Sequence, residues 1–275
     1  MEKTEKLQNI RHSLAHLLAA SVMDLYPDTK RTIGPAIDNG FYFDFEFAQP
    51  ISDTDLAKIE KNMRKILPTW NTFEKSELSG EEAKKEYPGN PYKHELIDEF
   101  TKDGAKVSFY KSGSYSDLCK GGHVENMKEI PADSFKLDRV AGAYWRGDEK
   151  NPMLTRIYGL AFDTKEELDA YIEQREEARK RDHRKIAKEQ DLLVFSDLIG
   201  AGMPMFTPKG NIIRNSIINF SRELNAELGF GEVHTPNFNK AELFKVSGHY
   251  DKYKEDMLTV RSQYSDEDFF LKPMN

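Results

Sequence analysis

The densest chemistry in this chain lies in two residue pairs, each with a gap of four positions. His12 and His16 form the first pair, and Cys119, the single cysteine, forms the second with His123. Side chains four apart on a helix project from one face, so the two histidines of the first pair can act together. Three imidazoles and one thiol are the ligand set of a tetrahedral zinc site, and they also suit a hydrolytic pocket. The residue types and their spacing leave both uses open.

The first histidine pair belongs to a helix predicted over residues 4–25. An apolar stripe marks this helix and consists of Leu7, Ile10, Leu14, Leu17, Leu18, Val22 and Leu25. On a helical wheel both histidines fall roughly opposite the stripe, which predicts that they are not core residues. A pair of exposed surface histidines is the alternative interpretation of this helix taken alone.

The segment that follows alternates between strands and short helices. The patterns predict a strand over 41–47, a helix over 53–67, a strand over 72–78, helices over 80–86 and 92–99, and strands over 135–163. Paired strands are also predicted around Ser112-Gly113-Ser114, with Cys119 in the second strand. Helices mixed with antiparallel strands, without a βαβ rhythm, predict an α+β domain over residues 1–163.

Residues 164–190 are predicted to form one long helix that opens with a capping box of Thr164 and Glu167. Beyond Glu173 this helix is polar on all sides, which is typical of a helix that bridges two domains. It also holds a locally basic stretch, residues 175–188, which is either a solvated face or a nucleic-acid contact.

A second module is predicted over residues 191–275. Its expected elements are a helix over 211–228, a strand over 232–236, and a terminal strand over 269–275 with nothing after it to cover it. Such an uncovered strand would be an aggregation hazard.

The composition excludes several classes of protein. No apolar run in the 275 residues approaches the ~20 needed to span a bilayer, and the charged N-terminus is not a secretory signal. A single cysteine excludes an intrachain disulfide and fits a reducing compartment, so we expect a cytoplasmic protein without a membrane partner. The net charge of −7 argues weakly against a purely electrostatic nucleic-acid binder, but not against an enzyme that acts on nucleic acid.

Several motifs, in order along the chain, resemble bacterial threonyl-tRNA synthetase, a class II enzyme. They are Arg11-His12-Ser13-Leu14-Ala15-His16-Leu17-Leu18, Ile33-Gly34-Pro35, Asp38-Asn39-Gly40-Phe41-Tyr42, Asp117-Leu118-Cys119-Lys120-Gly121-Gly122-His123-Val124, Gly142-Ala143-Tyr144-Trp145-Arg146-Gly147-Asp148 and Lys180-Arg181-Asp182-His183-Arg184-Lys185. The resemblance runs essentially end to end and is highly specific.

The resemblance implies a domain organisation. Residues 1–163 would be the editing domain with helices on an antiparallel sheet, 164–190 the linker helix, and 191–275 the first part of the class II antiparallel-sheet core. The helix over 211–228, together with the strand to Pro236, is similar to motif 1, which forms a homodimer in the full-length enzyme, and Leu271-Lys272-Pro273-Met274-Asn275 is similar to the approach to motif 2.

The implied activity is ATP-dependent attachment of threonine to its tRNA, with an editing domain that hydrolyses mischarged seryl-tRNA. Serine lacks one methyl group of threonine, and a single methyl supplies only ~1–3 kcal/mol of discrimination, so a second, hydrolytic site is expected. The implied partners are tRNA, threonine and serine. ATP motifs, the zinc ligands of the catalytic core and the anticodon-binding domain would lie beyond Asn275, and we therefore expect residues 1–275 alone not to activate threonine.

By the same resemblance, six residues form the editing site: His12, His16, Lys93, Asp117, Cys119 and His123. His123 is the preferred residue to hold and orient the attacking water. Lys93 would stabilise the oxyanion or the terminal phosphate, and Asp117 would hold the serine ammonium. Phe43 stands where some relatives have a tyrosine, whose role is then absent or moved to Tyr42, and Gly121-Gly122 stands in place of a common Gly-Pro.

The same four residues, His12, His16, Cys119 and His123, could instead bind zinc, as related alanyl-tRNA editing domains do. Four protein ligands would leave no position for a water, so for hydrolysis we favour a pocket without metal. Two alternatives to the synthetase interpretation are a freestanding trans-editing hydrolase and a non-catalytic, zinc-stabilised tRNA-binding module. The editing hypothesis requires all four side chains to converge on one cleft wide enough for an aminoacylated adenosine.

Overall fold

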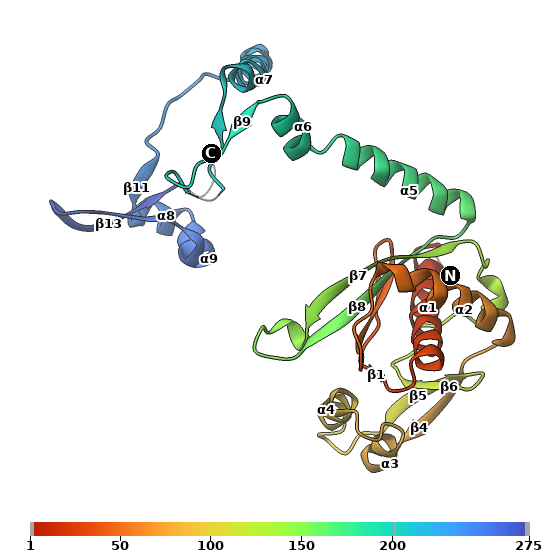
Figure 1. Cartoon of the computed structure of the whole chain (residues 1–275). Helices are drawn as coiled ribbons and strands as arrows, with labels where there is room; N and C mark the ends of the chain where they lie inside the picture. The colour runs from red at the N-terminus through yellow and green to blue at the C-terminus, as the bar shows by residue number, and fades with distance from the viewer. Residues whose placement is uncertain (1–2, 201, 273–275) are drawn as a thin grey trace. The chain divides into compact units, whose positions relative to one another are not determined.

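The computed structural model describes residues 3–200 and 202–272. The chain divides into two compact units, Met1–Lys180 and Arg181–Asn275, which are described separately. Figure 1 shows mixed helices and antiparallel strands in both, so the α+β class predicted from the sequence is confirmed.

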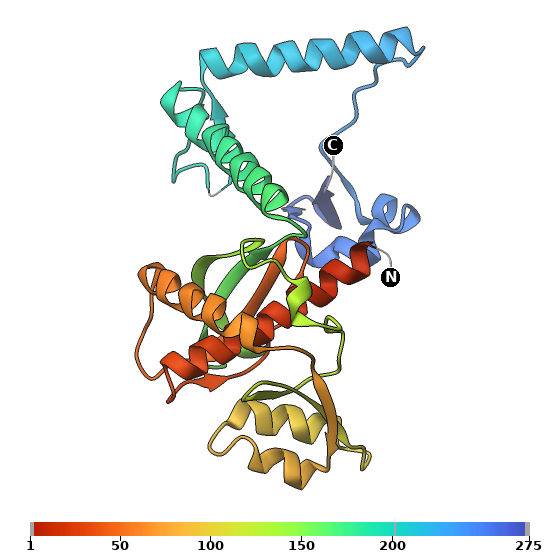
Figure 2. The ribbon, with the colours of Figure 1, turned by 90° about the vertical axis from the view of Figure 1, so that its right-hand side faces the viewer.

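The larger part of the first unit is an antiparallel sheet in the order β1-β3-β8-β7, with β2 added to β3. Its strands are β1 Lys30–Arg31, β2 Ala36–Ile37, β3 Gly40–Glu46, β7 Phe135–Tyr144 and β8 Met153–Ala161. Two helices pack on one face of this sheet, α1 Lys3–Leu25 and α2 Leu56–Ile66, and Figure 2 shows α1 crossing that face. The first unit thus places α1 against the core of the sheet.

Strand β3 supplies much of the sheet face that the helices cover. A phenylalanine at every second position of this strand directs three rings to the same side. Phe41, Phe43 and Phe45 are all buried against the helices. On the opposite side Asp44 is also buried, since Arg156 lies directly across the ladder and donates two hydrogen bonds to it, at 2.7 and 2.8 Å.

Helix α1 confirms the predicted helix over 4–25 but not the predicted position of its histidines. His16 is only 3% exposed and His12 is half-buried. The helical wheel assumed one covered side, whereas the segment after β6 covers α1 on the histidine side as well. The helix is therefore enclosed over most of its length, and His16 is a buried residue.

A smaller lobe of the first unit carries the sheet β4-β5-β6 and two helices. Its elements are β4 Glu74–Leu78, α3 Gly80–Lys85, α4 Pro91–Phe100, β5 Val107–Ser112 and β6 Tyr115–Leu118. The paired strands around Ser112-Gly113-Ser114 are confirmed, but Cys119 lies just past the end of β6 instead of inside the strand. Asn90 caps α4 by accepting a hydrogen bond from the backbone N–H of Lys93, which places Lys93 in the first turn.

The hairpin of β7 and β8 fastens α4 to the larger sheet. Trp145, at its tip, packs with Tyr92 and Leu154 and donates a hydrogen bond to Glu95 at 3.0 Å. Arg146 forms an ion pair with Glu95 at 2.6 Å. Short 3-10 turns complete the unit: η1 Asp53–Asp55, η2 Leu67–Thr69, η3 Met127–Glu129 and η4 Trp145–Gly147.

The helix predicted over 164–190 is two helices, α5 Lys165–Lys180 and α6 His183–Glu189. Asp182 interrupts it, because its carboxylate accepts the backbone N–H of Arg184 at 2.8 Å and so acts as the N-cap of α6. The all-polar composition of this stretch did not indicate that a second helix, α6, begins here.

The second unit contains one long helix and several short helices and strands. They are β9 Leu193–Val194, β10 Met205–Phe206, α7 Pro208–Glu227, β11 Phe238–Lys240, α8 Ala241–Val246, α9 His249–Tyr253, η5 Lys254–Asp256, β12 Thr259–Ser262 and β13 Ser265–Leu271. The strand predicted over 232–236 is irregular chain.

The prediction of an uncovered final strand is wrong, because β13 lies between β11 and β12 and pairs with both. Phe270 of β13 is buried with Phe244 and Met257 in a small core. Residues 273–275 of the predicted motif 2 approach lie outside the described residues. Across the described chain, no helix combines the length and apolar character needed to cross a membrane.

Candidate active site

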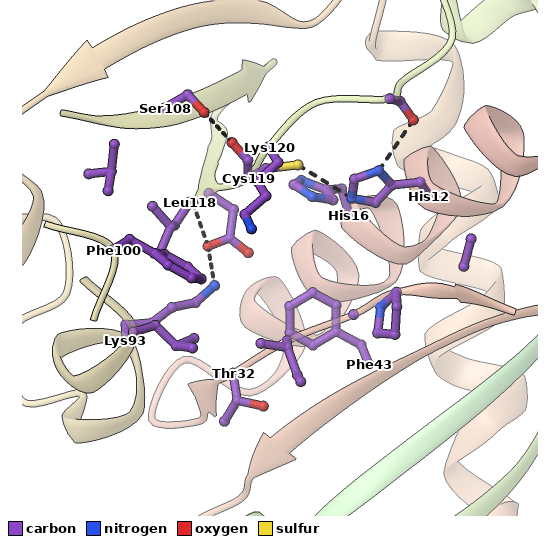
Figure 3. A pocket seen from close by; sticks show the side chains of 18 of the residues that line it. His12, His16, Thr32, Phe43, Lys93, Phe100, Ser108, Leu118, Cys119 and Lys120 are labelled. Carbon is purple, nitrogen blue, oxygen red and sulfur yellow. Dashed lines mark hydrogen bonds and ion pairs between the residues drawn. The ribbon is translucent and has the colours of Figure 1, made fainter. Parts of the chain in front are cut away.

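Two segments more than a hundred residues apart in the sequence bring the four predicted ligands together. Helix α1 supplies His12 and His16, and the loop after β6 supplies Cys119 and His123. One ligand atom from each of the four residues lies within 4.8 Å of the others. Figure 3 shows His12, His16 and Cys119 facing one another on one side of a cavity.

The thiol is the centre of this cluster. Cys119 Sγ lies 3.3 Å from Nε2 of His12 and 3.4 Å from Nε2 of His123, and it accepts the backbone N–H of Gly121 at 3.2 Å. Nδ1 of His12 lies 3.2 Å from the carbonyl oxygen of Gly122. Because a carbonyl only accepts hydrogen bonds, this nitrogen carries the proton, and Nε2 of His12 is an acceptor that faces the Cys119 thiol.

Both glycines of this loop have a positive φ, 98° for Gly121 and 86° for Gly122. Proline cannot adopt the second value, so the Gly-Gly pair makes a turn that Gly-Pro would not make in this conformation. The turn directs the Gly122 carbonyl to His12.

His123 is held in place by contacts with Phe73 and Ser13. Its ring stacks on Phe73, with 3.9 Å between the ring centroids. Ser13 Oγ lies 3.4 Å from Nδ1 of His123 and accepts the backbone N–H of Val124 at 3.1 Å. His12, His16 and Cys119 line the cavity, whereas His123 is not among the described residues that line it.

His16 is the buried member of the cluster. Within the described chain its Nδ1 has no hydrogen-bond partner, although the ring lines the cavity. Buried polar atoms are normally satisfied, so the unpartnered Nδ1 of His16 is unusual and could take part in binding a water, a ligand or a metal ion beside the cavity.

Burial decides the protonation of the cluster. Loss of hydration lowers the pKa of His12 and lowers that of His16 strongly. For His123, burial and the neighbouring His12 ring lower the pKa to about 3. Burial raises the pKa of the Cys119 thiol to about 11, against the backbone N–H of Gly121, which lowers it. Near neutral pH the site therefore holds neutral imidazoles and a protonated thiol.

A second group of polar side chains lies beside the cluster, around Asp117. Its carboxylate is 1% exposed and receives Lys93 Nζ at 2.7 Å and the Tyr87 hydroxyl at 2.5 Å on Oδ1. The Tyr115 hydroxyl donates to Oδ2 at 2.8 Å. Burial alone would raise the pKa of Asp117, but the cations of Lys93 and Arg31 outweigh it and hold the pKa well below its usual range.

Three residues around Asp117 were not predicted from the sequence: Arg31, Tyr87 and Tyr115. The Arg31 guanidinium carbon lies 5.1 Å from the ring centroid of Tyr87 and 4.6 Å from that of Tyr115. Tyr115 had a signal, since it stands two positions from Asp117 and so shares a face of the strand. Arg31 and Tyr87 come from distant segments, and nothing local in the sequence linked them to the site.

The cavity itself has a volume of about 790 Å³ and lies between the two lobes of the first unit. The larger lobe contributes α1, residues 32–36 and Phe43, and the smaller lobe contributes Lys93, Phe100 and Asp117. A volume of this size accommodates a ligand such as an aminoacylated nucleoside.

Phe43 forms part of the apolar wall. A Cβ at Gly34 would lie 2.1 Å from the Phe43 ring, so only glycine at position 34 allows the ring its place. Tyr42 points to the other face of the sheet, where the Arg156 guanidinium carbon lies 3.8 Å from its ring centroid. Tyr42 therefore does not replace a hydroxyl at position 43.

Comparison with known proteins finds a domain family that includes the loop of Cys119 and His123. A family described as the threonyl and alanyl tRNA synthetase second additional domain matches residues 107–158, which run from β5 through the Cys119 loop into β8. The chain thus contains part of a domain that these two kinds of synthetase share.

Longer matches are to threonine–tRNA ligases. Threonine–tRNA ligase of Gloeobacter violaceus is 48% identical over 277 residues, with 98% of this chain and 44% of the relative covered. That of Borreliella burgdorferi is 46% identical, with 100% and 47% covered, and that of Acetivibrio thermocellus 48%, with 96% and 41% covered. The chain is similar to threonine–tRNA ligases over nearly its whole length, as its motifs predicted, and it spans less than half the length of these relatives.

Proposed function

We propose that this chain hydrolyses the ester that joins serine to the terminal ribose of a tRNA, as the proofreading part of a threonine–tRNA ligase. The observation that carries this proposal is the cluster of neutral imidazoles and a thiol at the wall of a cavity, beside an ionised carboxylate and a lysine. The similarity to these relatives supplies the substrate, because they are named threonine–tRNA ligases.

In the proposed reaction a water attacks the carbonyl carbon of the ester. Nε2 of His12 or Nδ1 of His16 accepts the proton of that water, since both belong to neutral rings that line the cavity. The ester bond to the ribose oxygen then breaks, and that oxygen takes up the proton, which leaves free serine and tRNA. His123 stacks against Phe73, so we now assign it the role of holding Cys119 in place.

The carboxylate and the lysine have separate roles in this proposal. Oδ1 of Asp117 receives Lys93, Tyr87 and the backbone N–H of Leu118, whereas among the described residues Oδ2 receives only Tyr115. Oδ2 therefore keeps a lone pair for the serine ammonium. The ammonium of Lys93, next to it, is placed to stabilise the oxyanion that forms on the carbonyl oxygen.

Cys119 is not the nucleophile in this proposal. With a pKa raised to about 11, the thiol is almost fully protonated at neutral pH, and the thiolate is the reactive form. Attack by water, without an acyl-enzyme intermediate, fits this protonation state.

The test is deacylation of seryl-tRNA by the whole 275-residue chain and its variants. We expect His12→Ala and His16→Ala each to reduce the rate by about 100-fold or more, the usual range for loss of a general base. His234→Ala, at an exposed histidine in irregular chain of the second unit, is the matched control and should leave the rate unchanged. Wild-type rates in both site variants, with unchanged melting temperatures, would refute the proposal.

A zinc-binding role is the second candidate, favoured by the position of the four ligand atoms within 4.8 Å of one another. Three imidazole nitrogens and a thiolate suit a structural zinc ion, and the Gly122 carbonyl would orient His12 as an outer partner. A bound ion would fix the loop after β6 to α1. Equimolar zinc in the purified protein, with a chelator-induced fall in melting temperature, would favour this role over hydrolysis.

The activity of the whole protein is a further proposal from the family. We propose that the complete enzyme uses ATP to attach threonine to its tRNA and acts as a homodimer. Helix α7 supports the dimer, because Ile213, Ile217, Phe220 and Leu224 are all exposed along it. Apolar side chains in such a row commonly mark a protein interface.

A further inference from the structure

Two lysines at the cavity, Lys106 and Lys120, have no part in the chemistry proposed above. Both side chains line the cavity and both residues are exposed, which places them at its mouth. Lys106 directly precedes β5, and Lys120 follows Cys119 on the loop after β6. Within the described residues, neither ammonium is paired with a carboxylate.

Carboxylates that interact electrostatically with these lysines, namely Glu77 and Glu82 for Lys106 and Glu99 for Lys120, have closer partners. Glu99, which acts electrostatically on Lys120, is bound by Arg146 at 2.5 Å. Glu77, which acts on Lys106, is bound by Lys75 at 2.8 Å. Among the described residues, neither ammonium group therefore has a carboxylate of its own within ion-pair distance.

The lining of the cavity consequently has an excess of positive charge. Its charged residues are Lys93, Lys106, Lys120 and Asp117, and the first and last of these neutralise each other. Two positive charges remain at the mouth of the cavity, in a chain whose net charge is −7. This local sign favours an anionic ligand at the cavity and not elsewhere on an acidic protein.

Phe100 gives the two charges an apolar neighbour. The Lys120 ammonium lies 4.9 Å from the centroid of the Phe100 ring, and Figure 3 shows both side chains beside the cavity. A cation and an aromatic ring side by side are what proteins offer to a nucleotide, one to its phosphate and the other to its sugar or base.

We propose that Lys106 and Lys120 form a phosphate subsite that binds the phosphodiester next to the terminal ribose of the ester substrate. This inference rests on the proposed function and adds to it a way to select the substrate. The subsite makes the hydrolase prefer an ester at the end of an RNA strand over the ester of a lone nucleoside, because only the strand carries the phosphodiester.

The test compares seryl-tRNA with seryl-adenosine, which has the same ester and no phosphate. We expect Lys106→Gln and Lys120→Gln each to raise KM for seryl-tRNA by about threefold to fivefold, with kcat unchanged, as for an exposed ion pair. Hydrolysis of seryl-adenosine should not change. The dependence of log(kcat/KM) on log salt should become shallower by about 0.7 for each lysine removed.

Lys111→Gln is the matched control, since Lys111 is exposed on β5, which Lys106 directly precedes, and does not line the cavity. Three results would overturn the phosphate subsite: an equal effect on both esters, no effect on either, or the same effect from Lys111→Gln. In each of these cases hydrolysis by the wild-type chain leaves the proposed function standing. If the wild-type chain hydrolyses neither ester, the proposed function fails, and the subsite fails with it.

Discussion

Replacement of Lys93 by methionine tests the buried charge pair at the centre of the site. Lys93 is 2% exposed and Asp117 is 1% exposed, so the substitution leaves a carboxylate in the interior without its closest cation. Breaking such a pair from one side costs about 3–5 kcal/mol. Two tyrosine hydroxyls and Arg31, at 3.7 Å, still face Asp117, which favours the lower end, about 3 kcal/mol.

Tryptophan fluorescence in urea measures this loss in the relevant part of the molecule. The chain has two tryptophans, Trp70 and Trp145, and both lie in the first unit. The free energy of unfolding of Lys93→Met should be about 3 kcal/mol below that of the wild type near neutral pH. Lys93→Met combined with Asp117→Asn should recover part of the loss, because the uncompensated charge is then gone.

The loss of stability caused by Lys93→Met should depend on pH. The wild-type pair holds the pKa of Asp117 below its unfolded value, so its stabilisation is present above that value and is lost as pH falls through the folded pKa. Without Lys93, protonation of Asp117 relieves the penalty, and the gap between variant and wild type should narrow toward pH 4. A loss below about 1 kcal/mol at neutral pH would show that the carboxylate is not held by Lys93, and would refute this account.

Three further outcomes are expected. Burial lowers the pKa of all three histidines of the cluster, so the metal-free protein should keep its full free energy of unfolding above about pH 6.5. Below that pH it should lose about 1.4 kcal/mol per histidine per pH unit. Urea titrations should show a smaller slope for His16→Phe. Gly34→Ala should cost about 1–3 kcal/mol by thermal melting, since its Cβ meets the Phe43 ring, and Phe43→Leu in the same chain should recover part of this. At pH 7.5 Cys119 should react with iodoacetamide roughly 100-fold more slowly than an unperturbed thiol, and a rate near that of free cysteine would disprove the neutral thiol.

Local pattern was enough for the elements that carry the site. The spacing in residues 4–25 predicted α1, and the alternating phenylalanines predicted β3, because both patterns follow from one covered face. The paired strands before Cys119 were likewise visible from the short turn between them. The family motifs indicated six candidate site residues, and the structure brings all six into one region.

The features that were not predicted from the sequence depend on packing between distant segments. The burial of His16 depends on a loop a hundred residues away, and the hold on Asp117 depends on Arg31 and Tyr87 from two other segments. No periodicity within one element reports such contacts. The irregular chain at 232–236 and the central position of β13 also depend on pairing partners, which a strand propensity does not specify.

The contact of Trp145 and Arg146 with Glu95 has a consequence for ligand affinity. It joins the β7–β8 hairpin of the larger lobe to α4 of the smaller lobe, and α4 carries Lys93 into the cavity. The distance between the two cavity walls, one from each lobe, is therefore fixed when the protein folds. A ligand that enters such a preorganised cleft spends little of its binding free energy on ordering the walls, and more remains for the affinity itself.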